Sequence, residues 1–431
     1  MLHPGDPRDM ALEVVCAALR GQKSLQDVLD RTLKKIPDPR DKSLVTELSY
    51  GYLRYRGRMD FAVAWFLSAP RKLPFKLKTM MGLAAYELFF LDRVPSYATI
   101  SRTVDLGKHR FGSKMGSLIN AVLRQVTSVD VQDPGFFQRD HPSDLDFCSR
   151  FYSCPKWIVK TWFKDYGREQ AIRYLEQSLK KPPLGLRLAP GAGDPDLDNS
   201  LFLERRGPSL CLSQEHPEVS RWEEQGLAFR QSFAGQKALW ETGMTTWPSP
   251  VWDACAGRGG KALLMESQGL KIWASDYHLP RLQGLVQQIR EQGRDISVFA
   301  ARGEEPPLQA APGTVLLDVP CTGLGVLSRR PDIKWKRTPK EMNLMLGTQK
   351  ALLDAAAGIL PGAGELIYMT CTLSRAENET QMEHFLSRHK DFELIQTYLT
   401  DPAENLGEFF FAARMRRKRM DDRGQKTGSS T

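Results

Sequence analysis

The chain has 431 residues, about three times the usual size of one domain, which excludes a single small core. Hydrophobic residues make up 41% and charged residues 26%, a globular composition that excludes wholesale disorder. The longest nearly apolar run, residues 80–91, is too short to span a bilayer and no charged-then-apolar leader opens the chain, so we expect a cytoplasmic protein with no membrane partner.

The positive charge is concentrated in the first third of the chain. Residues 1–130 hold 21 Lys and Arg against 13 Asp and Glu, a net charge of +8 out of +9 for the whole protein. One stretch has a single acid, Asp60, and seven basic residues: Arg54, Arg56, Arg58, Arg71, Lys72, Lys76 and Lys78. Such a patch suits a polyphosphate partner such as nucleic acid, with a solvated basic face as the alternative.

Residues 9–127 have a helical pattern throughout. Apolar residues recur at three- and four-residue spacing, as in Leu12, Val15, Cys16 and Leu19. Glycine and proline interrupt the pattern at five places, which predicts six or seven short helices. We therefore expect residues 1–130 to form an all-α domain. Residues 128–142 have two prolines and no helical period, so they are interpreted as a linker.

The next segment, residues 143–235, changes character along its length. Helices are predicted at 155–166 and 168–181, separated by Gly167 in the usual C-cap position. Trp157 and Trp162 are expected to pack in the first of these helices rather than to stack on bases. Apolar runs at 182–190 and 226–233 then indicate strands, which predicts a small α+β connector.

From residue 236 to 414 the chain alternates short apolar runs with helix-compatible stretches, which predicts a Rossmann-like α/β domain. Strands are expected within 250–255, 271–276, 295–300, 313–321 and 364–372, and an apolar strand at 409–413 ends the domain. Ligands of such sheets bind at the carboxyl ends of the strands. Residues 415–431 are interpreted as a basic, disordered tail, in which Arg416–Arg419 aid binding by nonspecific electrostatics.

A glycine-rich loop follows the first of these strands. The sequence DACAGRGGK, residues 253–261, places three glycines before a helix, and glycine lets the backbone approach a ligand closely. Asp276 ends the second strand, 21 residues after Cys255, where it can accept hydrogen bonds from ribose hydroxyls. The glycine spacing is not GxGxxG, and a tight turn made for packing is the alternative. Together the loop and the acid predict a nucleoside cofactor.

Two thiols end neighbouring strand candidates at the same ligand-facing edge. Cys321 follows Asp318 after the fourth strand, and Cys371 follows the fifth. A lone cysteine is usually a small buried hydrophobe, but the pair favours nucleophilic chemistry. The seven cysteines include no CxxC and no histidine at metal-ligand spacing, so we expect no metal and a reducing compartment.

Three motifs carry a family resemblance. DACAGRGGK, DVPCTGLGVLSRRPDIKW and YMTCTLSRAENE resemble the cofactor-loop, Pro-Cys and Thr-Cys motifs of the Sun/Fmu (RsmB-like) family of S-adenosylmethionine-dependent RNA cytosine-C5 methyltransferases. The helical first third resembles the NusB-like RNA-binding domain of the ribosomal RNA members. CPKWIVKTWFKDYG resembles the start of their intermediate segment. The resemblance covers nearly the whole chain.

The resemblance implies a covalent mechanism. A thiolate adds to cytosine C6, after which C5 attacks the sulfonium methyl group, and a second thiol serves the later elimination. In this family the Thr-Cys cysteine is the nucleophile, which gives Cys371 that role and Cys321 the release step, and the reverse assignment is kept as the alternative. Asp318 is expected to face the cytosine edge, and Lys261 to orient or activate.

The cofactor implied is S-adenosylmethionine. The positions that match the family's binding residues are Cys255, Ala256, Gly257, Arg258, Gly259, Gly260, Lys261, Asp276, Arg302 and Asp318. Gly257 and Arg258 stand where the family has Ala-Pro, and Arg302 stands where it has an acid that meets the adenine amino group. Because arginine cannot accept a hydrogen bond, either Glu304 or Glu305 substitutes for that acid or cofactor affinity is lower.

The partner implied is RNA, with 16S rRNA, free or in an assembling small subunit, as the leading target of a monomeric enzyme. A tRNA methyltransferase and a non-catalytic RNA-binding assembly factor are the alternatives. Arg329, Arg330, Lys334 and Lys336 follow the Pro-Cys motif and are predicted to contact phosphate, with a solvated surface as the alternative.

Overall fold

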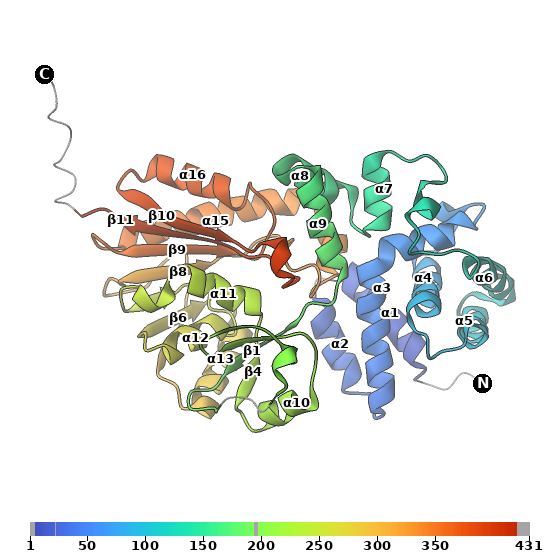
Figure 1. The fold of residues 1–431 in the computed structure, drawn as a ribbon, viewed down its shortest axis with the longest axis horizontal. Helices are drawn as coiled ribbons and strands as arrows, with labels where there is room; N and C mark the ends of the chain where they lie inside the picture. Colours follow the sequence, from blue (N-terminus) through green and yellow to red (C-terminus); the bar gives the residue numbers. More distant parts are fainter. Residues whose placement is uncertain (1–4, 22, 194–196, 420–431) are drawn as a thin grey trace, which may run out of the picture. The chain divides into compact units, whose positions relative to one another are not determined.

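The computed structural model describes residues 5–21, 23–193 and 197–419 (Figure 1). The chain forms two compact units. Residues 1–180 together with 327–337 form a helical unit, and residues 181–326 together with 338–431 form an α/β unit. The helical first third and the α/β domain with its large sheet confirm the predicted fold class.

The helical unit consists of α-helices and two short 3-10 turns. They are α1 (Pro7–Arg20), α2 (Leu25–Leu33), α3 (Pro39–Trp65), η1 (Pro70–Lys72), α4 (Phe75–Phe90), α5 (Ser96–Phe111), α6 (Ser113–Val126), η2 (Pro134–Gln138), α7 (Asp144–Phe151), α8 (Lys156–Tyr166), α9 (Arg168–Leu179) and α14 (Ile333–Lys336). The first three begin at Asp6, Ser24 and Asp38, whose side chains accept a hydrogen bond from a backbone N–H of the first turn. Trp162 is buried, as expected for a packing residue.

The segment expected as a linker, residues 128–142, contributes to the core of the helical unit. Phe136 and Phe137 of η2 are fully buried in the same hydrophobic cluster as the helices of the first 126 residues. Both rings lie within 5.5 Å of the Phe61 ring, measured between centroids. Two aromatic side chains therefore anchor this segment in the core. The prolines and polar residues around them, and the lack of a helical period, had indicated a linker instead.

The prediction of a basic face between residues 54 and 78 is wrong for Arg54 and Arg58. Arg54 and Arg58 are each only 5% exposed. Arg54 donates to the backbone carbonyl of Ser328 at 2.8 Å, and Arg58 donates to that of Phe151 at 2.5 Å. Lys76 pairs with Glu13 at 2.5 Å. Arg54 and Arg58 therefore bind within the unit, while other basic side chains of the unit are exposed, among them Arg102, Lys108, Lys114 and Arg124 of α5 and α6.

Residues 327–337 are continuous with the α/β unit in sequence at both ends but pack within the helical unit. Lys334, which is 0% exposed, donates from Nζ to the carbonyl of Arg54 at 2.8 Å. Trp335 Nε1 donates to the carbonyl of Leu53 at 2.7 Å. The predicted phosphate contact by Lys334 is therefore wrong, because its ammonium group is enclosed by protein. Lys336 donates to the carbonyl of Lys23 at 2.8 Å, whereas Arg330 is exposed.

The α/β unit begins with a small antiparallel sheet in the order β2-β3-β1-β4. Its elements are β1 (Leu184–Leu188), η3 (Asn199–Leu201), β2 (Phe202–Arg206), β3 (Ser209–Leu212), α10 (Pro217–Glu224) and β4 (Ala228–Arg230). Leucines of β1 and β3 pack with Val219 and Trp222 of α10 in a separate small core. The expected strands of the connector are β1 and β4, while its helices lie in the helical unit.

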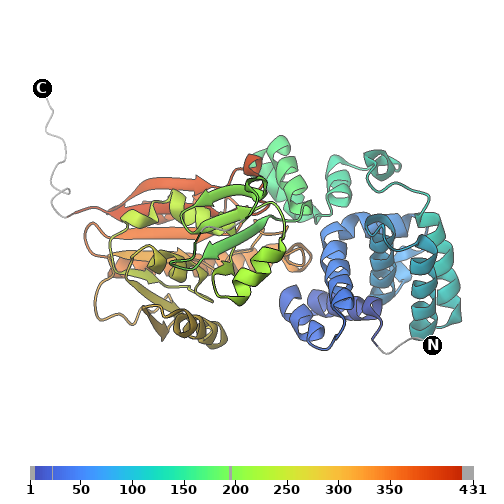
Figure 2. The ribbon, with the colours of Figure 1, turned by 60° about the horizontal axis from the view of Figure 1, so that its bottom comes forward.

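A seven-stranded sheet in the order β10-β11-β9-β8-β5-β6-β7 forms the centre of the α/β unit (Figure 2). The elements are α11 (Phe233–Glu241), η4 (Met244–Thr246), β5 (Val251–Asp253), α12 (Gly260–Ser267), β6 (Ile272–Asp276), α13 (Leu279–Gln292), β7 (Ile296–Ala300), β8 (Thr314–Asp318), α15 (Pro339–Ile359), β9 (Glu365–Thr370), α16 (Glu379–Arg388), β10 (Phe392–Leu399), η5 (Pro402–Glu404) and β11 (Phe411–Arg417). Strands β5 to β9 pair in parallel and match the five predicted strands, while β11 and β10 add antiparallel.

Two features of the last strands differ from expectation. Strand β10 was not predicted, and β11 continues to Arg417, three residues into the segment interpreted as a tail. Arg416 pairs with Glu365 at 2.9 Å and Arg417 with Asp391 at 2.8 Å, so these two arginines are engaged in the sheet rather than presented as a free basic tail. The tail from residue 420 onward lies outside the described residues.

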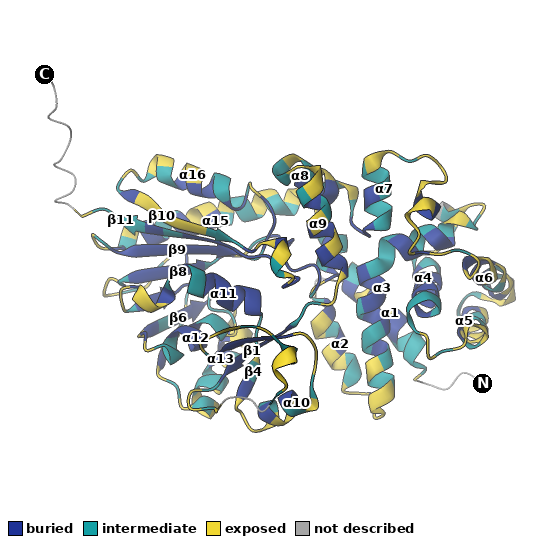
Figure 3. Ribbon diagram, viewed as in Figure 1, coloured by how far each residue is buried: buried dark blue, intermediate teal, exposed yellow. Residues whose placement is uncertain are grey.

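Helices pack along the width of the large sheet. Contacts run from α12 and α13 to β6 and β7, from α15 to β8 and β9, and from α16 to β10. Helix α15 begins with a capping box formed by Thr338 and Glu341. The central strands β8 and β9 are almost wholly buried, as Figure 3 shows. Among the described residues, none of the helices has the length and apolar character needed to cross a membrane.

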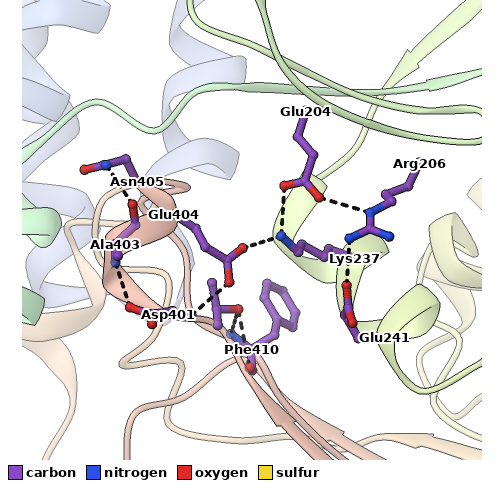
Figure 4. A network of polar contacts seen from close by, with 10 residues as sticks. Glu204, Arg206, Lys237, Glu241, Asp401, Ala403, Glu404, Asn405 and Phe410 are labelled. Carbon is purple, nitrogen blue, oxygen red and sulfur yellow. Dashed lines mark hydrogen bonds and ion pairs between the residues drawn. The ribbon is translucent and has the colours of Figure 1, made fainter.

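An ionic network joins the small sheet to the end of the large one (Figure 4). Lys237 of α11 donates to Glu204 of β2 at 2.8 Å and to Glu404 of η5 at 2.5 Å. Arg206 pairs with Glu204 and with Glu241, both at 3.1 Å. Burial lowers the pKa of Lys237, but its two carboxylate partners outweigh that effect and raise it to about 12. The lysine therefore stays charged and fixes the two sheets to each other.

Candidate active site

The glycine-rich loop connects β5 to α12 through two left-handed residues. Gly257 has φ 57° and Gly259 has φ 78°, backbone angles that residues other than glycine rarely adopt. A Cβ at Gly259 would lie 2.1 Å from the Leu285 side chain, so this glycine serves packing. A Cβ at Gly257 would meet only Asp276 Oδ2, at 4.0 Å. Backbone at Gly257 is therefore open to the close approach of a ligand.

Asp276 holds this loop against the end of β6. Its Oδ2 accepts a hydrogen bond from the Gly257 N–H at 2.9 Å, and its Oδ1 accepts one from the His278 N–H at 2.8 Å. Each carboxylate oxygen keeps a second lone pair that can accept a further hydrogen bond. The predicted acid and the predicted loop are thus in direct contact.

Lys261 and Asp318 form an ion pair at the same edge of the sheet. Lys261 Nζ, in the first turn of α12, lies 2.5 Å from Asp318 Oδ2 at the end of β8. Burial lowers the pKa of Lys261, but the negative charges of Asp318 and Asp253 outweigh it and raise that pKa overall. The lysine is therefore charged and fixes one oxygen of Asp318 while the other remains available.

The two thiols expected at neighbouring strand ends meet. Cys321 Sγ and Cys371 Sγ are 3.4 Å apart. Strands β8 and β9 pair in parallel with Asp318 opposite Met369, which brings the residues that follow them to the same place. The hydrogen bond with Cys371 and burial both raise the pKa of the Cys321 thiol well above its ordinary value.

A buried glutamate that the sequence reasoning missed holds both cysteine segments. Glu377 is 0% exposed; it accepts hydrogen bonds from the Thr322 N–H at 2.9 Å and from the Thr322 hydroxyl at 2.5 Å. Thr322 and Thr372, each next to one of the two paired cysteines, share a hydroxyl–hydroxyl bond of 2.7 Å. Gln349 of α15 donates to Glu377 at 3.1 Å. Glu377 lies inside the Thr-Cys motif, but nothing in its spacing along the sequence distinguished it from a surface acid.

Gly325 allows the two segments to approach closely. Its N–H donates to the Cys371 carbonyl at 3.0 Å, and its own carbonyl accepts from the Phe409 N–H at 2.8 Å. A Cβ at this position would lie 2.2 Å from the Phe409 carbonyl oxygen and 2.9 Å from that of Cys371. Both neighbours are backbone atoms that cannot rotate away as a side chain can, so only glycine fits.

Arg302 lies in the loop after β7 and is exposed, as is Arg258. Glu304, two residues further, lies close enough to Cys255 for its charge to act on that thiol. Burial is the main cause of the raised pKa of Cys255, and the charges of Asp253, Asp318, Asp276 and Glu304 add to it. Of the two glutamates that could substitute for the missing acid, Glu304 is therefore the one whose charge acts on the glycine-rich loop.

The residues fit a cofactor of the expected kind. Gly257 exposes backbone, Asp276 has unused lone pairs, and Asp253 at the end of β5 is 1% exposed with neither oxygen hydrogen-bonded within the described residues. A site with an open backbone, a free acceptor and an uncompensated carboxylate suits a ligand that carries hydroxyl groups and positive charge.

Comparison with known proteins agrees with this geometry. The family model described as 16S rRNA methyltransferase RsmB/F matches residues 247–417, and the NusB family model matches residues 6–128. The probable ribosomal RNA small subunit methyltransferase B of Synechocystis sp. is 31% identical over 84% of this chain and 85% of that protein. Ribosomal RNA small subunit methyltransferase B of Escherichia coli O6:K15:H31 is 27% identical over 95% of this chain and 98% of that protein.

Solved structures share the fold. The crystal structure of PH0851 superposes with a TM-score of 0.76 at 19% identity, covering 97% of this chain and 100% of that chain. A methyltransferase homologue from Pyrococcus horikoshii has a TM-score of 0.55 at 22% identity and covers 64% of this chain. With its NusB-type first third, its paired Pro-Cys and Thr-Cys thiols and these relatives, the chain belongs to the RsmB/F (Sun/Fmu) family of ribosomal RNA methyltransferases.

Proposed function

We propose that this protein transfers a methyl group from S-adenosylmethionine to C5 of a cytosine in 16S rRNA, through a covalent bond between Cys371 and C6. The observation that carries the proposal is the Cys321–Cys371 pair, with sulfur atoms 3.4 Å apart, at the strand ends that also carry the Lys261–Asp318 ion pair. Enzymes that add a thiol to an unsaturated ring need a nucleophile and groups that stabilise the developing charge. The names of the bacterial relatives support ribosomal RNA as the substrate.

The cofactor would lie on the glycine-rich loop. Backbone at Cys255–Gly260 would approach it, Asp276 would accept hydrogen bonds from ribose hydroxyls, and Glu304 would serve the adenine in place of the acid that Arg302 replaces. When bound, the cofactor supplies an electrophilic methyl group on a positively charged sulfur.

Cys371 acts as the nucleophile in this proposal. The raised pKa of Cys321 supports it, because a thiol that resists ionisation remains a hydrogen-bond donor to its neighbour. Cys321 S–H then stabilises the Cys371 thiolate, which adds to cytosine C6. Glu377 keeps both segments in register through Thr322 and Thr372.

Asp318 acts on the cytosine edge. Its lone pairs can accept from the exocyclic amino group, or its carboxyl form can hydrogen-bond N3, and either contact draws electron density out of the ring as the C6–S bond forms. Lys261 holds Asp318 in place. After methyl transfer C5 loses its proton to a water molecule, the electrons of the C5–H bond re-form the C5–C6 double bond, and the sulfur of Cys371 leaves with the electrons of the C6–S bond. Cys321 lies close enough to protonate that departing sulfur.

The experiment is methyl transfer to defined RNAs. The protein is incubated with methyl-labelled S-adenosylmethionine and, separately, with unmethylated 16S rRNA, assembling small subunits and total tRNA, and labelled positions are mapped by bisulfite sequencing. Label at a cytosine of 16S rRNA is expected, with none in the Cys371→Ala variant. Label in tRNA alone would move the substrate to tRNA. Binding of RNA without any label or cofactor binding would make the protein an assembly factor.

A further inference from the structure

Cys321 and Cys371 are two partly exposed thiols in direct contact. Their sulfur atoms are 3.4 Å apart. A disulfide bond is about 2.05 Å long, so a movement of about 1.4 Å would join them. Four of the remaining cysteines are buried: Cys16, Cys148, Cys154 and Cys211. At the Cys321–Cys371 pair, therefore, an oxidant from solvent meets two thiols at once.

The backbone holds the two cysteine segments at a spacing that a disulfide spans. Strands β8 and β9 pair in parallel with Asp318 opposite Met369, and neighbouring strands lie about 4.8 Å apart. The Cα atoms joined by a disulfide usually lie about 4.4 to 6.8 Å apart. Beyond the strand ends, the Gly325 N–H donates to the Cys371 carbonyl at 3.0 Å and keeps the two segments together. Closing a bridge therefore needs movement of the side chains rather than of the strands.

The surroundings give the two thiols different parts in an oxidation. Peroxides react with a thiolate rather than with a thiol. The hydrogen bond with Cys371 and burial raise the pKa of Cys321 well above its ordinary value, so Cys321 keeps its proton. Burial and the acids around it do the same to the pKa of Cys255, the thiol of the glycine-rich loop. Cys371, the nucleophile of the proposed function, is then the sulfur that a peroxide oxidises, and Cys321 is the thiol beside it.

We propose that Cys321 and Cys371 form a reversible disulfide when the protein meets a peroxide, and that this bridge switches methyl transfer off. The loss of activity rests on the proposed function, because the bridge ties up the thiol that attacks cytosine. Formation of the bridge rests on the geometry of the two sulfur atoms alone. Disulfides in reducing compartments are usually of this transient, redox-sensing kind.

The oxidation takes place in two steps. The Cys371 thiolate attacks hydrogen peroxide, so that an S–O bond forms and the O–O bond breaks. The hydroxide that leaves takes up the proton that Cys371 had lost, and Cys371 becomes a sulfenic acid. The Cys321 sulfur then attacks this sulfur, the S–S bond forms, the S–O bond breaks, and the Cys321 proton leaves with the hydroxide as water. Two thiols are thus oxidised to a disulfide while one peroxide is reduced to two waters.

Cys321 also protects its neighbour. A sulfenic acid that finds no thiol is oxidised further to a sulfinic acid, which ordinary thiol reductants do not reverse. Because the Cys321 sulfur is already in contact with Cys371, it reacts before a second peroxide arrives. A dithiol reductant then restores both thiols by thiol–disulfide exchange. Oxidation of this pair should therefore be a switch rather than damage.

Mass spectrometry detects the bridge independently of activity. The full-length protein is treated with a small excess of hydrogen peroxide, its remaining thiols are blocked with iodoacetamide, and the protein is digested. A pair of peptides joined through Cys321 and Cys371 is expected, lighter than the two free peptides by two hydrogen atoms, and it should disappear with dithiothreitol. Recovery of both cysteines blocked by iodoacetamide, or of Cys371 as sulfinic acid without a bridge, would overturn the inference.

A variant without the neighbouring thiol tests the protection. In Cys321→Ala, peroxide should convert Cys371 to the sulfinic acid, heavier by two oxygen atoms, and dithiothreitol should not reverse the change. The control Cys148→Ala removes a buried cysteine and should form the same bridge as the wild type. If Cys371 of Cys321→Ala stays reduced or recovers fully with dithiothreitol, the protective role of Cys321 is wrong.

Methyl transfer to RNA tests the switch. Oxidised wild type should lose activity by more than about tenfold, because the bridge removes the nucleophile, and should regain it with dithiothreitol. Binding of S-adenosylmethionine, measured by calorimetry, should persist, since the bridge involves neither Gly257 nor Asp276. Full activity of a protein in which the bridge is detected would contradict the switch. A bridge in a protein that shows no methyl transfer before oxidation would contradict the proposed function and leave the bridge standing.

Discussion

Replacing Lys334 by methionine should make the protein more stable at neutral pH. The lysine is 0% exposed, and its ammonium group donates to the Arg54 carbonyl at 2.8 Å. Arg54 and Arg58 lie near enough to oppose its charge. Burial lowers the pKa of Lys334 from 10.5 to about 7, so burying this lysine lowers the free energy of unfolding at pH 7. Methionine has a similar length and needs no hydrogen-bond partner.

The magnitude follows from that change in pKa. A difference of about 3.5 between the unfolded and folded values corresponds to at most about 5 kcal/mol. The lost hydrogen bond offsets about 1 kcal/mol of this, and packing differences offset more, so a gain of about 2 to 4 kcal/mol is expected at pH 7. Between pH 7 and 10.5 the unfolded chain binds a proton that the folded chain lacks. The stability of the wild type therefore rises with pH, by up to about 1.4 kcal/mol per unit.

Urea unfolding followed by circular dichroism at pH 7 and pH 9 tests this reasoning. The advantage of Lys334→Met should shrink by about 2 to 3 kcal/mol between the two pH values, because the variant lacks the titrating group. Lys336→Met, in the same segment, should keep the wild-type dependence on pH since Lys334 is still present. A Lys334→Met variant that is less stable than the wild type by the same amount at both pH values would refute the argument.

Four further outcomes follow from the site and the surface. Glu377→Gln should lower kcat by about 10²-fold with little change in cofactor affinity, because misplacing the reacting thiols by an ångström has that cost; an unchanged kcat would remove its positioning role. Gly325→Ala should reduce the rate at least as much through its clash with two carbonyls, while Gly347→Ala, which meets nothing within 4 Å, should not. Glu304→Ala should weaken S-adenosylmethionine binding by about 1 to 3 kcal/mol, as calorimetry would show. Replacing Lys108 and Arg124 by glutamine should lower the salt dependence of RNA affinity by about 0.7 to 0.9 in slope per lost phosphate contact, and an identical slope would exclude α5 and α6 as RNA ligands.

Local sequence patterns predicted those elements in which the buried side chains are apolar. Strands β5 to β9 were expected because each is a short apolar run before a helix-compatible stretch, and the parallel sheet then brings Cys321 and Cys371 together by topology alone. Strands β10 and β11 were missed or misplaced for a physical reason. Strand β10 is a largely exposed edge strand, and β11 ends in arginines whose carboxylate partners are Glu365 and Asp391.

Residues whose role depends on distant partners could not be predicted. Lys334 donates to the Arg54 carbonyl, and Arg54 donates to the Ser328 carbonyl in the segment that carries Lys334. Because these partners are far apart in sequence, both side chains were interpreted as surface cations. Glu377 is another case: an acid five residues from Thr372 becomes buried only when the loops of two strands close over it. Charge in the sequence does not indicate exposure when a backbone carbonyl or a hydroxyl from elsewhere supplies the partner.

The covalent step is the central claim, and trapping of the protein on RNA tests it most directly. Wild type, Cys321→Ala, Cys371→Ala and the double variant are incubated with 16S rRNA and S-adenosylmethionine and then run on a denaturing gel. Cys321→Ala should give a stable protein–RNA band, because addition and methyl transfer proceed while release stalls. Cys371→Ala and the double variant should give none. A stable band from Cys371→Ala with none from Cys321→Ala would reverse the two roles, and no band from any variant that still methylates RNA would contradict the covalent mechanism.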